Sequence, residues 1–123
     1  MKADRSGKKR VSIGYLGSID RELADRLDDL RRYSGTLDAA IEACNGKYAV
    51  SATRDVCVGL RETEYALRHA KNLSTSSGQF LDEDTFLSIN RELLDYEKQL
   101  KDADKRFGTS CSCVHKSYLK KML

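Results

Sequence analysis

Residues 86–107 read FLSINRELLDYEKQLKDADKRF, and this stretch decides the fold. Its apolar positions recur alternately three and four residues apart, at Phe86, Ile89, Leu93, Tyr96, Leu100, Ala103 and Phe107. A repeat of 3.5 residues is typical of one narrow apolar stripe on a straight helix of about six turns. Charged side chains fill most of the positions between, among them Arg91, Glu92, Asp95 and Glu97. Because a single helix cannot bury such a stripe alone, we expect the rest of the chain to supply partner helices.

Two further helical patterns precede this stretch. The first covers about residues 16–45 and can begin near Gly14 or Ser18, of which Ser18 suits an N-cap; we expect Asn45-Gly46 to end the helix in a left-handed conformation. Its apolar positions are Leu16, Ile19, Leu23, Leu27, Leu30, Leu37, Ile41 and Cys44. Gly35 lies inside this pattern and predicts a bend but no stop. The second pattern covers about residues 48–73, with Val50, Thr53, Val56 or Cys57, Leu60, Thr63, Leu67 and Ala70 on its apolar side.

The third helix covers about residues 82–107, and Asp82 is its expected N-cap. Three long helices joined by short loops predict an all-α fold, an antiparallel (up-down-up) three-helix bundle with coiled-coil-like heptad packing. We assign residues 13–107 to the bundle and residues 1–12 to a basic flexible lead. Residues 108–123 form a cysteine-containing basic tail, and the sequence leaves open whether the tail makes a short docked helix or frays.

The composition limits the classes of function. The 123 residues suit one domain, 33% of them are charged, and there is no proline to interrupt a helix. The net charge of +3 comes from the two ends, so the body lacks the basic face of a nucleic-acid-binding domain. No apolar run approaches the roughly 18 residues of a membrane span, and no signal peptide is recognisable. We therefore expect a cytoplasmic protein whose four cysteines are free thiols.

One row of basic residues is the main candidate for a binding site. Lys47, Arg54, Arg61 and Arg68 follow one another at intervals of seven residues, so they lie along one edge of the second helix. The sequence leaves two interpretations open. The row makes ion pairs with acidic residues of neighbouring helices, or it is a docking edge for an acidic partner protein.

No motif predicts catalysis, a metal site or a cofactor. Cys111, Cys113 and His115 offer three soft ligands, whereas a structural zinc site needs four and usually two residues between its cysteines. His69, followed by Lys71, resembles a histidine phosphotransfer module, but the lysine comes one residue earlier than in that family. We therefore expect a protein that is not an enzyme.

The chain also resembles tubulin-binding cofactor A, a family of small three-helix chaperones in the tubulin folding pathway. The resemblance covers roughly residues 5–61 and rests on Val11-Ser12-Ile13-Gly14-Tyr15-Leu16, on Asn45-Gly46-Lys47-Tyr48-Ala49-Val50 and on Asp55-Val56. The chain departs from the family in lacking a proline between its second and third helices and in having an acidic, leucine-rich first helix. The resemblance implies a chaperone that holds β-tubulin, and Tyr48 is the matched position that it adds to the basic row.

Together these observations predict a non-catalytic, protein-binding helical bundle that acts as a chaperone or assembly factor, with β-tubulin as the implied partner. The predicted binding residues are Lys47, Tyr48, Arg54, Arg61 and Arg68. One alternative is a helical subunit or adaptor of a larger coiled-coil complex, and a remote one is a phosphotransfer protein that uses His69. The sequence leaves open whether the chain is a monomer or a homodimer.

Overall fold

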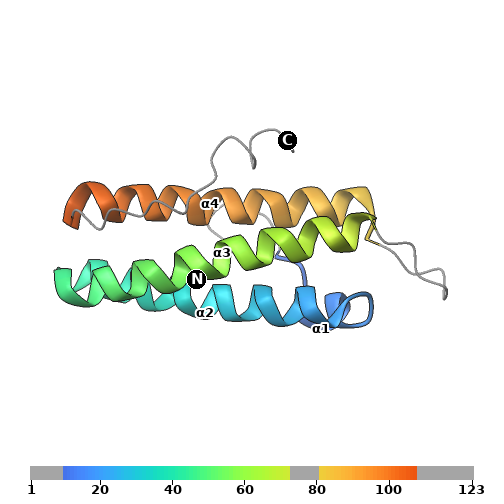
Figure 1. The fold of residues 1–123 in the computed structure, drawn as a ribbon, viewed down its shortest axis with the longest axis horizontal. Coiled ribbons are helices and arrows are strands. Elements are labelled where there is room, and N and C mark those ends of the chain that lie inside the picture. Colours follow the sequence, from blue (N-terminus) through green and yellow to red (C-terminus); the bar gives the residue numbers. More distant parts are fainter. Residues whose placement is uncertain (1–9, 73–80, 108–123) are drawn as a thin grey trace.

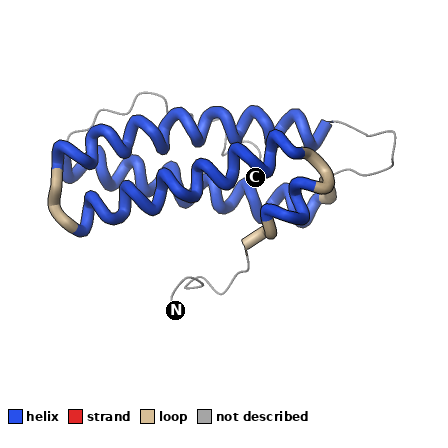
Figure 2. The backbone as a smooth tube through the Cα atoms, turned by 90° about the horizontal axis from the view of Figure 1, so that it is seen from below, coloured by secondary structure: helices blue, strands red, loops and turns tan. Residues whose placement is uncertain are grey.

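The fold is all-α, as the sequence predicts. A computed structural model describes residues 10–72 and 81–107, and these residues form four α-helices and no β-strand. The helices are α1 (Ile13–Gly17), α2 (Arg21–Glu42), α3 (Gly46–Asn72) and α4 (Glu83–Phe107). Figure 1 shows α2, α3 and α4 side by side along the long axis, each running opposite to the one before it, with the short α1 at the start of α2. Figure 2 shows the same arrangement from a second side.

The first predicted helix is two helices in the structure. Ser18 is the C-cap of α1 and not the N-cap of a long helix. The N-cap of α2 is Asp20, whose Oδ1 accepts hydrogen bonds from the backbone N–H groups of Glu22 at 3.0 Å and Leu23 at 3.4 Å. A carboxylate at this position satisfies two otherwise unpaired donors and suits the positive end of the helix dipole, so α2 begins at Arg21. From there α2 continues through Gly35 to Glu42.

The turn between α2 and α3 also differs from the prediction. Cys44, and not Asn45 or Gly46, has the left-handed backbone conformation, with φ of 52°. Asn45 is engaged elsewhere, because its Oδ1 accepts a 3.1 Å hydrogen bond from the N–H of Tyr48 and so caps α3. Gly46 begins α3 beside the end of α4, since a Cβ added to it would lie 3.5 Å from Cδ1 of Phe107.

The apolar stripe of α4 faces the core as predicted. Phe86, Ile89, Leu93, Tyr96, Leu100 and Ala103 are buried, and Phe107 at the helix end is partly buried. Asp82 caps α4, because its Oδ1 accepts a 2.7 Å hydrogen bond from the N–H of Thr85. The predicted apolar stripes of the first and second helical patterns are buried along most of their length. Ile19 and Ile41 are partly buried, and Cys44 and Val50 are exposed.

The structure also bears on two expectations, one about the cysteines and one about membrane spans. Cys44 is a free cysteine, but Cys57 is disulfide-bonded, so the expectation of four free thiols is wrong for Cys57. The residue spacing alone gives no information on which thiols meet, which is why the sequence missed this bond. Among the described helices, none is both long enough and apolar enough to cross a membrane.

Candidate protein-binding surface on α3

The four basic residues singled out by their spacing all lie on α3, and all are exposed. We call Lys47, Arg54, Arg61 and Arg68 the α3 basic row. An α-helix rises 1.5 Å per residue, so the row extends for about 30 Å along the helix. Tyr48, which the family resemblance adds, lies at the same end as Lys47 and is 68% exposed.

Three members of the α3 basic row make no ion pair that holds the described helices together. In the part of the chain that the structure describes, Lys47, Arg54 and Arg61 form no ion pair with an acid of a neighbouring helix. Arg61 and Arg68 act electrostatically on Glu64 of their own helix. The interpretation that the row exists to make interhelical ion pairs therefore finds no support for Lys47, Arg54 and Arg61 within residues 10–72 and 81–107.

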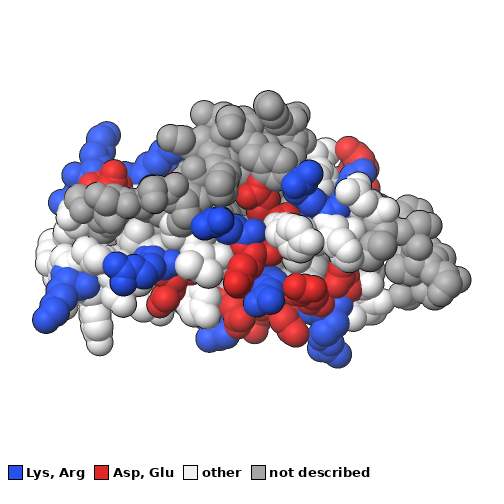
Figure 3. Space-filling view, in the orientation of Figure 1, with Lys and Arg blue, Asp and Glu red and all other residues white. Residues whose placement is uncertain are grey.

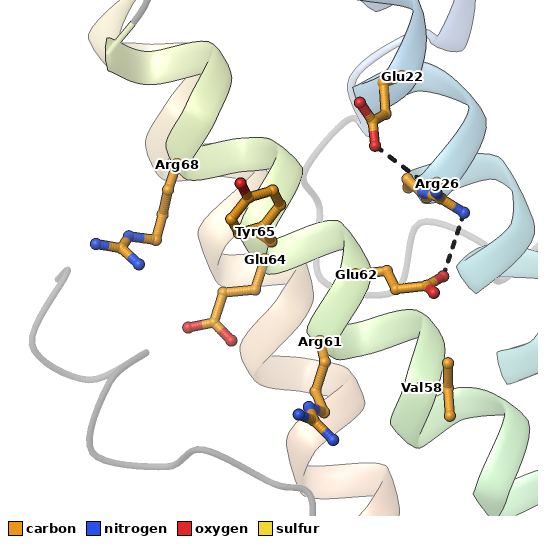
Figure 4. Close-up of a pocket in the computed structure, with 8 residues that line it drawn as sticks. All are labelled: Glu22, Arg26, Val58, Arg61, Glu62, Glu64, Tyr65 and Arg68. Carbon is orange, nitrogen blue, oxygen red and sulfur yellow. Dashed lines mark hydrogen bonds and ion pairs between the residues drawn. The ribbon is translucent and has the colours of Figure 1, made fainter.

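Large apolar side chains are exposed beside the row. Tyr65 is 67% exposed and Val58 is 48% exposed. Both line an open surface hollow whose other lining residues are Glu22, Arg26, Arg61, Glu62, Glu64 and Arg68. In Figure 4, Arg61, Glu64 and Arg68 project from one side of α3, whereas Glu62 projects toward α2. An exposed tyrosine between guanidinium groups is typical of the residues that dominate protein interfaces.

Two ion pairs close the α2 side of this hollow. Arg26 of α2 lies 3.3 Å from Glu62 of α3 and 3.6 Å from Glu22 of its own helix. All three side chains are at least two-fifths exposed, so these pairs stabilise the fold only slightly. The wider surface carries both signs of charge, and Figure 3 shows basic and acidic side chains interspersed over the face that it presents. The cations of the row are thus a local feature of α3 and not part of a uniformly basic face.

The strongest polar contact of the fold was not predicted. Arg31 of α2 donates two hydrogen bonds to Glu92 of α4, from Nε to Oε2 at 2.8 Å and from Nη2 to Oε1 at 2.9 Å. The Tyr96 hydroxyl also donates to Glu92, and Arg31 Nη2 donates to the carbonyl oxygen of Val11 at 3.0 Å. Burial acts to raise the pKa of Glu92, but the hydrogen bonds from Arg31 and Tyr96 outweigh it and hold the pKa below its ordinary value. This cluster joins α2, α4 and Val11, which lies two residues before α1.

A second polar cluster follows one to two turns further along the same two helices. Gln99 of α4 accepts a 2.8 Å hydrogen bond from the Ser34 hydroxyl. Its amide nitrogen donates to the Ser34 carbonyl oxygen at 3.0 Å and to Oδ1 of Asp38 at 2.7 Å. The contact between α2 and α4 is therefore specified by hydrogen bonds as well as by apolar packing. Spacing along the sequence contains no signal for these pairs, because each joins residues more than sixty positions apart.

Between α3 and α4 the buried polar groups are less well satisfied. Glu64 of α3 and Glu97 of α4 are buried, and one carboxylate oxygen of each has no hydrogen-bond partner. Burial raises the pKa of Glu64 to about 7, and the charge of Glu97 adds to this effect while Arg68 and Arg61 oppose it. Asn90 is fully buried, and neither polar atom of its side chain is hydrogen-bonded.

The remaining candidates from the sequence have no contacts that indicate chemistry. His69 is exposed on α3, and its ring stacks on Tyr65 with 6.3 Å between centroids. Lys71 lies 3.3 Å from Glu83. Cys111, Cys113 and His115 lie outside the described residues, and within the described ones no group of three or more His, Cys, Asp or Glu side chains is placed to hold a metal ion.

Comparisons with known proteins add no relative. The chain matches no protein-family model, no curated protein and no solved structure. The case for a function therefore rests on the geometry of α3 and on the resemblance seen in the sequence.

Proposed function

We propose that this chain is a non-catalytic helical bundle that binds a protein partner through α3 and acts in the cytoplasm as a chaperone or assembly factor. The observation that carries the proposal is the exposed α3 basic row, in which Lys47, Arg54 and Arg61 have no ion-pair partner among the described residues. These cations lie beside the exposed Tyr48 and Tyr65. Charge of this kind, with tyrosines next to it, gives electrostatic steering together with apolar contact area.

The chemistry of the row defines the partner. Guanidinium groups bind carboxylates through two parallel hydrogen bonds, so the partner surface is acidic. Because the row is about 30 Å long and straight, the matching acidic groups lie along an extended strip such as one helix. Tubulin is an acidic protein, and the resemblance in residues 5–61 makes β-tubulin the partner to test first. In this proposal α2, α3 and α4 pack by heptads, and this packing makes the row a rigid binding surface.

A capture experiment with a charge-reversed variant tests the proposal. The purified chain is used as bait in a eukaryotic lysate beside the variant Arg54→Glu/Arg61→Glu, and bound proteins are identified by mass spectrometry. The matched control is Arg91→Glu/Lys98→Glu, which changes the same charge at exposed positions of α4. We expect tubulin to be captured by the parent and the control, and at least tenfold less by the α3 variant. Equal capture by both variants contradicts the proposed surface, and tubulin at background with the parent contradicts the proposed partner.

One observation favours a second function, that of a subunit or adaptor in a larger coiled-coil complex. The exposed positions Arg54, Val58, Arg61, Tyr65 and Arg68 follow one another at steps of four and three residues, which is the spacing of a second helix-pairing seam. This function predicts capture of other coiled-coil proteins with tubulin at background. It also predicts self-association of the isolated chain, which light scattering behind a sizing column measures.

A further inference from the structure

Glu64 lies within the α3 basic row, between its last two members. Arg61 precedes Glu64 by three residues and Arg68 follows it by four, so both guanidinium groups are its neighbours on the helix surface. All three residues line the surface hollow, and Figure 4 shows their side chains projecting from the same side of α3. The row therefore contains one acid at the position where it is expected to bind the carboxylates of a partner.

Burial distinguishes Glu64 from the other acids of the hollow. Glu64 is 6% exposed, and its Oε2 has no hydrogen-bond partner. Glu22 and Glu62 are exposed, and both are paired with Arg26. Because a buried carboxylate without a donor is costly in free energy, burial favours the neutral form of Glu64 and raises its pKa to about 7. Glu64 therefore changes its charge close to neutral pH.

Charged groups from two helices act on the carboxyl group of Glu64. Among the described residues, Arg68 and Arg61 of α3 favour its ionised form, and Glu97 of α4 opposes it. On the α2 side, Arg26 lines the hollow, and its ion pairs with acids of α2 and α3 offset its charge. The charge of Glu64 thus depends on its burial, on one acid of α4 and on two arginines to which the proposed function assigns partner binding.

We propose that Glu64 is a proton-dependent regulator of the α3 binding surface, which binds an acidic partner more tightly when Glu64 is protonated than when it is ionised. This inference rests on the proposed function and adds a regulation to it. When Glu64 is ionised, its negative charge offsets the charges of Arg61 and Arg68 and repels the carboxylates of the partner. When Glu64 is neutral, it no longer reduces the positive potential of the two guanidinium groups.

Proton binding and partner binding are linked in both directions. A partner carboxylate beside Arg61 or Arg68 adds negative charge near Glu64, so it raises the pKa of Glu64 in the complex. The complex therefore takes up protons as it forms, and its affinity falls as the pH rises through 7. A coupling of about tenfold lies within the usual range for linked sites. Because the pKa of Glu64 in the free chain is about 7, this coupling makes binding about fivefold weaker at pH 8 than at pH 6.

Binding of poly-L-glutamate to the full chain tests the proposal, because this peptide supplies carboxylates whatever the natural partner is. The affinity is measured by calorimetry from pH 6 to pH 8 at constant ionic strength. We expect the parent to lose affinity about fivefold over this range. Glu64→Gln stays neutral at every pH, so it should keep the pH 6 affinity throughout. A parent with constant affinity, or a Glu64→Gln variant that still loses fivefold, overturns the proposal.

Three further variants separate Glu64 from other titrating groups. Asp95→Asn removes one exposed acid from α4, and His69→Gln removes the ring that stacks on Tyr65. Imidazole also changes its charge between pH 5 and pH 8, which makes the histidine variant the stricter control. We expect both to keep the fivefold loss, and its absence in either overturns the assignment to Glu64. Glu97→Gln removes a charge that raises the pKa of Glu64, so the loss should begin at lower pH.

The charge of Glu64 can also be followed directly, through the NMR signal of its carboxyl carbon, which is assigned from its absence in Glu64→Gln. We expect a titration midpoint near pH 7 in the free chain and at higher pH with poly-L-glutamate bound. A midpoint at the ordinary glutamate value, or one that the bound peptide does not move, overturns the proposal. Absence of peptide binding at every pH contradicts the proposed binding surface and this inference with it. Binding that does not depend on Glu64 contradicts this inference alone.

Discussion

Replacing Arg31 by methionine is the most informative test of how the helices are held together. Arg31→Met keeps the length of the side chain and removes its charge. Glu92 then loses both hydrogen bonds from the guanidinium group and is left as a carboxylate whose side chain is 8% exposed. Breaking one side of a buried ion pair costs about 3 kcal/mol of unfolding free energy. For a chain of this size that loss lowers the melting temperature by about 10 °C.

Adding a second substitution at Glu92 is expected to restore part of the unfolding free energy that Arg31→Met loses. Adding Glu92→Gln to Arg31→Met removes a buried carboxylate whose remaining cation is the exposed Arg10 at 3.9 Å, and it leaves an amide oxygen that accepts the hydrogen bond from Tyr96. We therefore expect the double variant to be about 2 kcal/mol more stable than Arg31→Met alone. Urea unfolding followed by circular dichroism at pH 7 measures both values. The pKa of Glu92 is lowered in the folded protein, so the contribution of the pair is complete at pH 7 and is lost as the pH falls below the ordinary glutamate value.

An exposed ion pair provides the control. Arg26 and Glu62 also join two helices, but their side chains are 40% and 48% exposed. Arg26→Met therefore costs at most about 1 kcal/mol. If Arg31→Met costs no more than Arg26→Met, or if adding Glu92→Gln makes the protein less stable still, the buried cluster does not hold α2 to α4 and the reasoning is refuted.

Three further predictions concern single positions. Gly35→Ala stabilises the protein by about 0.5–1 kcal/mol, because nothing lies within 4 Å of the added Cβ. Gly59→Ala destabilises it, because the added Cβ would lie 3.2 Å from the Tyr33 ring. Thermal unfolding measures both effects. Asp20→Ala costs about 1 kcal/mol by the same assay and Ser18→Ala less, because Asp20 and not Ser18 caps α2. The pKa of Glu64 is raised to about 7, so the folded state holds a proton that the unfolded state releases, and urea stability falls as the pH rises from 5 to 7. Glu64→Gln removes this fall, and an unchanged slope in that variant contradicts the assignment.

The sequence predicted those parts of the fold that depend on local spacing. The stripe from Phe86 to Ala103 is buried because a period of 3.5 residues keeps one side of a helix toward the core. Asp82 caps α4 because a carboxylate followed by further acids satisfies the first turn. Local chemistry was less decisive where several good capping residues lie close together. Ser18 and Asp20 compete for one helix start, and the carboxylate accepts two hydrogen bonds where a hydroxyl accepts one.

The contacts between helices were beyond such reasoning. Arg31 and Glu92 have the spacing of solvent-exposed charges, and only the packing of α2 on α4 turns them into a buried pair. Glu97 was likewise assigned to the exposed positions of its helix, yet it is buried against α3. The α3 basic row was predicted correctly as one edge, because it depends only on spacing along one helix. Its role in binding a partner stays a prediction.

Different sides of α3 carry the packing contacts and the α3 basic row, so substitutions on each side can be tested separately. Toward α2 the helix presents small residues, and Gly59 brings it close to Leu30 and Tyr33. Toward α4 it presents Glu64 and Cys57, and its outer surface carries the α3 basic row. Changes at Lys47 and Arg54 alter exposed cations, so they reduce partner binding while the unfolding free energy stays within about 0.5 kcal/mol. Arg61 and Arg68 also act on the buried Glu64. Changes toward α2 or α4 alter buried groups and lower stability before they affect binding. A variant of the row that loses helicity would therefore show that the same residues stabilise the fold, and the docking interpretation would fail.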